Sequence, residues 1–490
     1  MVEADHRQSG RCNASQPPTY SPALGQPVSA PILRGILVLH GFAFMRPTCL
    51  VGALVFSLAL LAPNASMARP PIANDKTTLL RNGTVWTATG VVLHQTDILW
   101  RDGRIAAMGK NLLGRPDTHT IDVKGKIVTP GLVDMHSHLG VYAAPFAKAK
   151  QDGNEMTMPT TPFVRAIDAF DPEDLAIARA VEGGVTTALI LPGSGNVMGG
   201  QALYVKLFGK TVAEMQVSNP PRAMKWAMGE NPKRVYGERT MMPSARLGHA
   251  WVMRQKLFDA REVRDLQDRW DRDSKSDAKA PPRPFRPDLE PLVALLRGEV
   301  LLQVHCYEVH DIETLLRVAE EFNFKVAAIH HALEAWKVPK LLKEHAVAVA
   351  TFADLWGFKM EAYDASAFSP KLLHEAGVRL ALKTDHPVLD AKWFAFEAAK
   401  AHHYGLPEQA ALQAVTRNPA LAIGLGNRIG TLEVGRDADV LVWPQSPFVI
   451  GAQPERVFID GVQVVGDGVN AQAAWSVDAR GNAGVCGCGH

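Results

Sequence analysis

Cysteine is scarce in this chain, with five residues in 490, and so few cannot form the framework of a disulfide-rich scaffold. An excess of charge of one sign is also missing, because 52 basic residues stand against 50 acidic ones. A chain without such a field is not expected to bind nucleic acid. Hydrophobic residues make up 47% of the sequence, which excludes wholesale disorder. The length predicts two or three domains, or one large barrel with additions.

The first 68 residues are predicted to lie outside the fold. Residues 1–44 are rich in Pro, Ser, Gln and Gly and are interpreted as a non-native or disordered extension. Residues 45–68 have the pattern of a signal peptide, with a positive start at Met45, an apolar run and a small-residue site that ends at Ala68. The apolar run is shorter than the about 20 residues of a comfortable membrane span. The sequence therefore predicts a periplasmic or secreted protein without a stable membrane anchor after cleavage, and an N-terminal anchor or a buried helix is the alternative.

Short runs of β-forming residues occupy both ends of the remaining chain. They are separated by the pairs Asn82-Gly83 and Asp102-Gly103 near the start and by Asp460-Gly461 near the end. Asn-Gly and Asp-Gly are the strongest short hairpin signals. The pattern predicts one small β domain built from residues 69–128 and 426–470. Residues 471–490, with Cys486 and Cys488, are expected to form a flexible tail without a function.

Strands and helices alternate in the middle of the chain. In the clearest stretch, strands are expected at 300–306, 325–331, 346–351 and 378–385, with helices at 312–322, 334–345 and 370–376. The strand segments are almost continuously apolar, as parallel strands buried on both faces must be. Repeated units of this kind predict a (β/α)8 barrel over residues 129–425 rather than an open sheet. The charged, Pro-rich residues 271–287 are interpreted as a surface insertion.

Residues that bind metals stand at the ends of four predicted strands. His136 and His138 are one residue apart, so both imidazoles project to the same side of a strand and can reach one metal. His305 ends a second strand, and Asp385 ends another. A third strand ends with His330 and His331. Because the carboxyl ends of barrel strands converge on one mouth, the pattern predicts a metal site there. Core or capping residues at all four positions are the alternative.

Together with further motifs, this pattern resembles the amidohydrolase superfamily and, within it, the imidazolonepropionase-like branch. The motifs lie at residues 136–138, 183–187, 193–201, 228–237, 384–387 and 435–439. The resemblance runs from about Thr77 to Val465 and therefore covers nearly all of the predicted mature chain. It implies an α/β fold: a metal-centred (β/α)8 TIM barrel with a small β-sandwich domain assembled from both ends. It also implies hydrolysis of a carbon–nitrogen bond.

The resemblance also implies which residues hold the metal. His136 and His138 match the first-strand ligands, His305 and His331 match the fifth- and sixth-strand histidines, and Asp385 matches the eighth-strand aspartate. Zinc is the expected ion, as one or two ions per site. Adjacent strand residues face opposite ways, so His331 is assigned to the site and His330 is expected to pack outside it.

A bridge between two ions is expected at Glu230. Superfamily members supply a carboxylated Lys or a Glu here, and Glu230 stands at the end of the strand predicted for residues 222–230. Lys225 would lie about 16 Å deeper at the ordinary rise of a strand and is expected to be too far inside. A one-metal site of His136, His138, His305 and Asp385 is the alternative.

The predicted activity is hydrolysis of an amide, cyclic amide or dipeptide bond by activated water. Asp385 and His331 are the expected catalytic residues, and His386 is expected to orient Asp385. Asn196, Arg234 and Arg246 are candidates for binding a small-molecule or peptide substrate, although solvated surface arginines are the alternative. A homo-oligomer is considered. Deamination of a cyclic amidine at the same site, or an inactive binding protein of the same fold, remains the alternative function.

Overall fold

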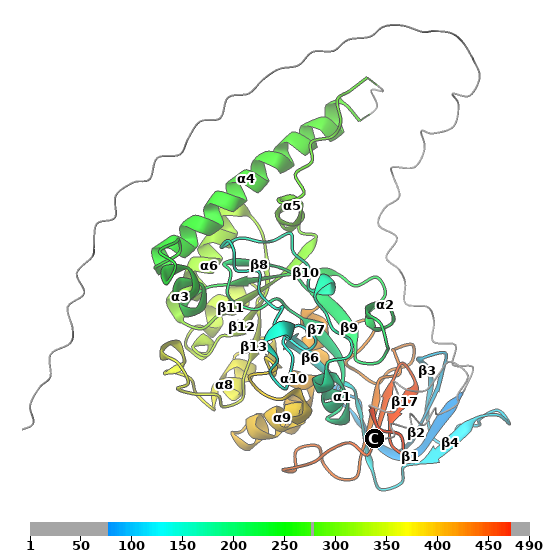
Figure 1. The fold of residues 1–490 in the computed structure, drawn as a ribbon. Coiled ribbons are helices and arrows are strands. Elements are labelled where there is room, and N and C mark those ends of the chain that lie inside the picture. Colours follow the sequence, from blue (N-terminus) through cyan, green and yellow to red (C-terminus); the bar gives the residue numbers. More distant parts are fainter. Residues whose placement is uncertain (1–76, 276–278, 472–490) are drawn as a thin grey trace, which may run out of the picture. The chain divides into compact units, whose positions relative to one another are not determined.

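The computed structural model describes residues 77–275 and 279–471 (Figure 1). The predicted extension, the predicted signal peptide and the two C-terminal cysteines lie outside these residues. The described residues belong to one compact unit, so the predicted division into a β domain and a barrel domain stays a prediction. No helix in this part of the chain is long and apolar enough to cross a membrane.

Strands from both ends of the described chain form one sheet. Its members are β1 (Thr78–Trp86), β2 (Val92–Arg101), β3 (Arg104–Gly109), β4 (His119–Asp122), β5 (Ile127–Pro130), β15 (Val440–Trp443), β16 (Arg456–Ile459) and β17 (Val462–Val465). Their order is β17-β16-β15-β5-β1-β2-β3, with β4 beside β1, and the blue and red strands lie together in Figure 1. The two β-rich ends thus meet in one sheet, while a separate sandwich domain stays a prediction.

Two of the three predicted hairpin turns are present. Asp102-Gly103 joins β2 to β3, and Asp460-Gly461 joins β16 to β17. The prediction for Asn82-Gly83 was wrong, because β1 continues through both residues with a shift in register against β2. Asn82 adopts a φ of 63°, a left-handed conformation that Asn tolerates. The pair therefore forms a bulge within a strand rather than a turn.

The strands of the middle form two further sheets. The first contains β6 (Leu132–Ser137), β7 (Val185–Ile190) and β9 (Leu203–Lys206); the second contains β8 (Met198–Gln201), β10 (Arg222–Ala227), β11 (Val300–Cys306), β12 (Val326–His331), β13 (Ala348–Thr351) and β14 (Leu380–Leu382). Strands β10 to β14 are parallel, as are β6 and β7. However, β8 and β9 run antiparallel to β10 and β7. A (β/α)8 barrel contains only parallel strands, so the prediction was wrong for the segment that forms β8 and β9.

Backbone hydrogen bonds link these two sheets at both edges. Ala202, between β8 and β9, donates to Ala223 of β10 at 2.9 Å. At the other edge, Asp385 donates to the carbonyl of His136 at 2.9 Å, and His138 donates to His386 at 3.1 Å. The described strands do not form one closed barrel sheet. The architecture is a TIM-barrel-like α/β fold with mixed sheets.

Helices alternate with the strands of the middle (Figure 1). They are α1 (Leu175–Glu182), α2 (Val212–Met215), α3 (Glu230–Gly237), α4 (Arg246–Asp273), α5 (Glu290–Leu296), α6 (Val309–Phe322), α7 (Pro339–Glu344), α8 (Ser369–Glu375), α9 (Phe394–His403), α10 (Glu408–Val415) and α11 (Arg417–Ala422). The single helix expected at 334–345 is divided, because Pro339 disfavours helical geometry at Val338. A short 3-10 helix, η3 (Ala335–Lys337), precedes α7. The expected insertion begins within α4, and residues 279–287 contain no helix or strand.

Candidate metal centre

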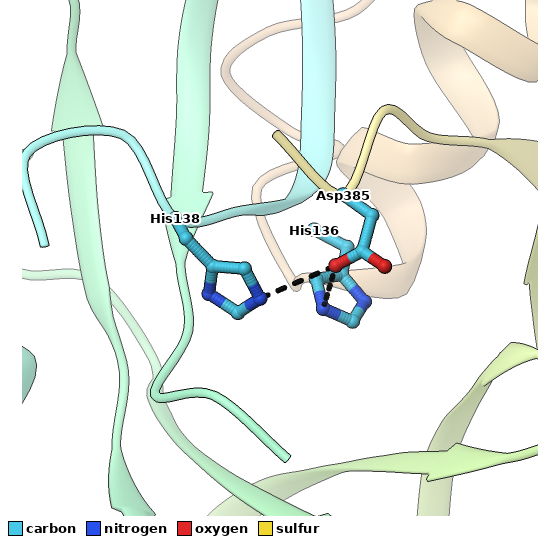
Figure 2. Close-up of side chains that lie close together, drawn as sticks. All are labelled: His136, His138 and Asp385. Atoms are coloured by element: carbon cyan, nitrogen blue, oxygen red, sulfur yellow. Dashed lines mark ion pairs between the residues drawn. The ribbon is translucent and has the colours of Figure 1, made fainter. Parts of the chain in front are cut away.

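Two imidazoles and one carboxylate converge where β6 ends and where the chain leaves β14. Figure 2 shows His136 and His138 both pointing at Asp385. One carboxylate oxygen, Oδ1 of Asp385, lies 3.1 Å from His136 Nε2 and 3.2 Å from His138 Nε2. All three residues are buried, and one ligand atom from each lies within 4.8 Å of the others. The group thus has the residue types and the spacing that hold one metal ion.

Hydrogen bonds at the other ring nitrogens aim lone pairs at this carboxylate. Nδ1 of His138 donates to the carbonyl of Leu191 at 2.7 Å, which leaves Nε2 as an acceptor. Nε2 of His330 donates to Oε1 of Gln303 at 2.8 Å, so Nδ1 of His330 is an acceptor. Nδ1 of His136, 3.0 Å away, donates to it, which leaves the lone pair of His136 on Nε2. At 3.2 Å, the lone pair of His138 and the carboxylate repel each other unless a cation or a proton lies between them. This arrangement fits a metal ion.

Asp134 fixes the distance between the two chain segments that carry this group. Its Oδ1 accepts hydrogen bonds from the backbone nitrogens of His136 at 3.2 Å and Thr384 at 3.3 Å. The hydroxyl of Thr384 donates to the other oxygen. Burial raises the pKa of Asp134 to about 6, against the lowering effect of these hydrogen bonds. The sequence analysis missed Asp134, although it stands two residues before His136.

His331 lies beside Asp385, and His305 packs against His331. Their ring centroids are 4.2 Å apart, and Nδ1 of His331 lies 3.6 Å from Oδ2 of Asp385. Nε2 of His305 and both ring nitrogens of His331 are buried without a hydrogen-bond partner among the described residues. Buried polar atoms are nearly always paired, so these orphaned nitrogens also fit a metal ligand set.

His330 occupies a position that the sequence analysis excluded. Its ring packs against His136, with centroids 4.7 Å apart, and is buried. The expectation that it packs outside the site was wrong, because His331 leaves the strand conformation with a φ of 67°. Strand alternation ends at that residue, so both side chains approach the group.

Lys225 is also at the site, contrary to expectation. Its Nζ lies 3.2 Å from Nε2 of His136 and donates to the carbonyl of Pro192 at 3.3 Å. The expected depth was wrong because β10 ends at Ala227, so that Lys225 is two residues from its end. Glu230 instead begins α3, and its backbone nitrogen donates to Oε2 of Glu361 at 2.9 Å. The structure does not bring Glu230 into the group formed by His136, His138 and Asp385.

Burial and neighbouring charges set the ionisation of the group. Burial acts to raise the pKa of Asp385, but the Lys383 ammonium and the imidazoles of His136 and His331 outweigh it and hold the pKa well below its usual value. Burial lowers the pKa of Lys383 to about 8 and that of Lys225 to about 7. Burial also lowers the pKa of His136, and Lys225 adds to that effect. The site therefore holds an ionised carboxylate.

The residues expected to bind the substrate or to orient Asp385 have other contacts. The amide nitrogen of Asn196 donates to the carbonyls of Glu155 and Met158 at 2.5 and 2.9 Å. Nδ1 of His386 accepts from the backbone of Ala391 at 3.3 Å. Arg246 is paired with Glu308 and Asp311, and Arg234 is exposed on α3. Their predicted roles stay predictions.

Two tyrosines that the sequence analysis missed flank the histidines. The ring of Tyr142 meets that of His138 edge-on at 5.2 Å. Tyr307 stacks on His331 with centroids 4.7 Å apart and planes 8° apart. Tyr307 stands two residues after His305, and this spacing was the only signal for it in the sequence.

A cavity of about 590 Å³ is lined by residues that contact neighbours of this group. It is lined by Asn154, which bonds the hydroxyl of Tyr142, and by Pro192, whose carbonyl accepts from Lys225. The glycine-rich segment also contributes, through Asn196 and Gly199. Tyr142 therefore lies between the cavity wall and His138, and Lys225 lies between the wall and His136.

Comparison with known proteins decides the family. Residues 312–464 match the model described as the amidohydrolase family. The crystal structure of an amidohydrolase from Thermotoga maritima MSB8 is 38% identical, with a TM-score of 0.74, and the match covers 79% of this chain and 99% of that one. This chain belongs to the amidohydrolase family.

Curated relatives agree with that assignment. Amidohydrolase tasK from Hapsidospora irregularis is 37% identical over 428 residues, which are 80% of this chain but 44% of that protein. The chain thus spans less than half the length of tasK. An imidazolonepropionase from Symbiobacterium thermophilum is 26% identical over 379 residues, 70% of this chain and 82% of that protein. The predicted resemblance to the amidohydrolase superfamily is confirmed.

Proposed function

We propose that this amidohydrolase is a metal-dependent enzyme that hydrolyses a carbon–nitrogen bond in an amide, a cyclic amide or a dipeptide. The observation that carries the proposal is the convergence of His136 and His138 on the buried carboxylate of Asp385. An ionised carboxylate that faces two imidazole lone pairs is a ligand set for a divalent cation, and zinc is the ion that such ligands favour. When bound, such an ion supplies an acidified water molecule and polarises the scissile carbonyl.

Asp385 is the proposed carrier of the proton. Its Oδ1 faces His136 and His138, whereas Oδ2 lies 3.6 Å from His331 and 3.5 Å from Lys383. Because its pKa is held well below the usual value, the carboxylate is ionised at neutral pH and can accept the proton of the attacking water. The same proton then passes to the leaving nitrogen, which completes the hydrolysis. His331 lies beside Asp385 and is the proposed partner of the substrate carbonyl oxygen or of a second ion.

A site with two ions is supported by the second pair of histidines. His305 and His331 present unpartnered buried nitrogens beside Asp385. Lys225, carboxylated at Nζ by carbon dioxide with loss of a proton, takes the place of Glu230 as the candidate bridge, because its Nζ lies against His136 whereas the backbone of Glu230 is bonded to Glu361. The cavity lined by Asn154 and Pro192 is the proposed place for a small molecule or a short peptide.

A metal analysis combined with a hydrolysis screen tests the proposal. The wild-type protein is expected to contain one or two divalent ions per chain and to hydrolyse at least one member of a panel of amides, dipeptides and lactams. Asp385→Asn serves as the inactive control. Ammonia release from cyclic amidines, without hydrolysis of the panel, would instead assign deamination. A metal-free protein that stays inactive after zinc is added would contradict both activities.

We also propose that the enzyme is exported, with Met45–Ala68 removed as a signal peptide. The support is the order of charged, apolar and small residues in that segment. N-terminal sequencing of the extracytoplasmic protein is expected to begin near Arg69. A soluble cytoplasmic protein that retains residues 45–68 would contradict export and leave the hydrolase proposal intact.

A further inference from the structure

A buried carboxylate faces the unpartnered nitrogen of His305. Glu361 belongs to a short 3-10 helix, η4 (Met360–Ala362), in the segment between β13 and α8. Its side chain is 1% exposed, and its Oε1 lies 3.9 Å from Nε2 of His305. That nitrogen has no hydrogen-bond partner among the described residues. The two groups therefore face each other without solvent access.

Three groups from separate parts of the chain hold this carboxylate in place. The backbone nitrogen of Glu230 donates to its Oε2 at 2.9 Å, and Nζ of Lys359 donates to its Oε1 at 2.5 Å. Arg246 at the start of α4 adds a charge 3.9 Å from Oε2. A buried carboxylate is costly unless it is paired in this way. Burial raises the pKa of Glu361 above its usual value, and Lys359 and the backbone nitrogen of Glu230 act against that effect.

The backbone before α3 also makes room for Glu361. Gly229 has a φ of 84°, a conformation that favours glycine. A Cβ at this position would lie 2.4 Å from Oε2 of Glu361. The motif at residues 228–237 thus contains a glycine whose absence of a side chain lets the carboxylate reach the backbone nitrogen of Glu230.

We infer that Glu361 is a positioning residue that accepts a hydrogen bond from Nε2 of His305 and leaves Nδ1 of that ring as the metal-binding atom. The inference rests on the proposed function, since it treats His305 as a ligand. Metal-binding histidines commonly donate their second ring N–H to a carboxylate, which fixes the tautomer and the ring orientation. A separation of 3.9 Å exceeds a hydrogen bond by about 1 Å, and a small rotation of the ring closes it, as catalytic hydrogen bonds often tighten when a site is loaded.

The same segment also supports the neighbouring histidine. Nζ of Lys359 lies 3.9 Å from the ring centroid of Tyr307, and Tyr307 stacks on His331. The residues between β13 and α8 therefore contact the surroundings of both His305 and His331. A change in the charge of Glu361 is expected to reach the second pair of histidines and to leave His136 and His138 in place.

Glu361→Gln tests the inference against a matched control, Glu397→Gln. Glu397 is equally a buried carboxylate: it accepts from the backbone nitrogen of Ala353 at 2.9 Å and pairs with Lys400. We expect Glu361→Gln to weaken zinc binding 10- to 100-fold in chelator competition, the loss typical of such partners. Glu397→Gln should change it less than threefold. Glu361→Asp keeps the charge and should restore part of the affinity, also where the Gln variant folds poorly.

Nitrogen NMR of the metal-free protein gives a readout that does not depend on activity. The His305 signal, assigned with a His305→Gln variant, is expected to show the Nε2–H tautomer in the wild type and in Glu397→Gln, and to lose that preference in Glu361→Gln. Unchanged zinc affinity and tautomer in Glu361→Gln would overturn the inference, as would an equal loss of zinc affinity in Glu397→Gln. A wild type that binds no zinc would overturn the proposed function, while the tautomer would still decide the role of Glu361.

Discussion

His331 and Asp385 have left-handed backbones, and these two residues explain how so many ligand types gather in one place. Their φ angles are 67° and 55°, which cost side-chain-bearing residues about 1–2 kcal/mol each. His331 is the last residue of β12 and Asp385 stands three residues after the end of β14, so the alternation of side chains no longer applies. Strain of this kind clusters at functional sites, where the surrounding structure maintains it.

Replacing Asp385 by Asn is expected to lower turnover by at least 100-fold without unfolding the protein. The amide has neither the charge to hold a cation nor a basic oxygen to take a proton, and a general base typically contributes 10²–10⁴-fold. Steady-state kinetics on the substrate found in the screen, with circular dichroism as the control for folding, measures this. A loss below about tenfold would show that another residue accepts the proton.

The number of bound metal ions should show whether Lys225 or Glu230 forms the bridge between two ions. We expect Lys225→Met to lower the number of bound ions, because it removes the nitrogen, 3.2 Å from Nε2 of His136, that would carry the bridging carboxylate. Glu230→Gln should keep the wild-type number, since the backbone of Glu230 rather than its side chain contacts Glu361. Elemental analysis of both purified variants is the measurement. A loss of metal in Glu230→Gln alone would restore Glu230 as the bridge.

Sequence reasoning could find the candidate metal ligands near strand ends, but it could not find the residues that contact and position them. His136, His138 and Asp385 were recognisable because the strands around them are apolar and a polar residue at the end of such a strand is informative. Lys225 was placed too deep because the end of β10 had to be estimated from the sequence, and an error of three residues displaces a side chain by about 10 Å. Glu361 lies in an irregular segment, where no periodicity relates it to His305.

At the scale of elements, the prediction succeeded where apolar runs were long. Strand β11 has the expected bounds, Val300–Cys306, and α6 begins three residues earlier than expected and ends at the same residue, Phe322. The third strand was missed, because Gly199 and Gly200 in β8 give no alternating pattern. Its antiparallel direction follows from pairing across space, which one sequence does not record.

Helix α4 contains a buried histidine that should make stability depend on pH. Both ring nitrogens of His249 lack a hydrogen-bond partner among the described residues, and burial lowers its pKa from 6.5 to about 4. As the pH falls from 6.5 to 4, the unfolded chain binds a proton that the folded chain does not, so folded stability is lost over this window. The loss attributable to His249 is about 3 kcal/mol.

His249→Leu is expected to remove this part of the pH dependence. Above pH 7 the histidine is neutral in both states, so the two proteins should differ mainly through packing; at pH 4.5 the variant should gain in relative stability. Urea unfolding of wild type and variant across pH 4.5–7.5 measures the difference, and His94→Gln, at an exposed histidine, is the control. Parallel curves for wild type and His249→Leu would show that His249 is solvated or paired in solution.

At the scale of the whole molecule, one buried lysine connects the C-terminal part of the described chain to the middle. Nζ of Lys206, the last residue of β9, lies 2.5 Å from Asp439, 3.0 Å from Asp460 and 3.3 Å from Asp437. Burial acts to lower the pKa of Lys206, but these three carboxylates outweigh it and raise the pKa above its usual value. Asp437 and Asp439 belong to the motif at residues 435–439, which the sequence identified without showing its partner.

Lys206→Met should therefore destabilise the protein by about 3–5 kcal/mol, the cost of leaving buried charges without a partner. Three carboxylates would remain close together, so the loss should be largest near neutral pH and smaller at pH 4, where protonation relieves their repulsion. Urea unfolding at both pH values measures this. Lys150→Met removes a lysine whose side chain is 58% exposed in its pair with Asp171 and should cost less than about 1 kcal/mol. If Lys206→Met lowered the free energy of unfolding as little as this control does, solvation by water rather than the ammonium would be stabilising the three carboxylates. The connection between β9 and the C-terminal strands would then depend on packing alone.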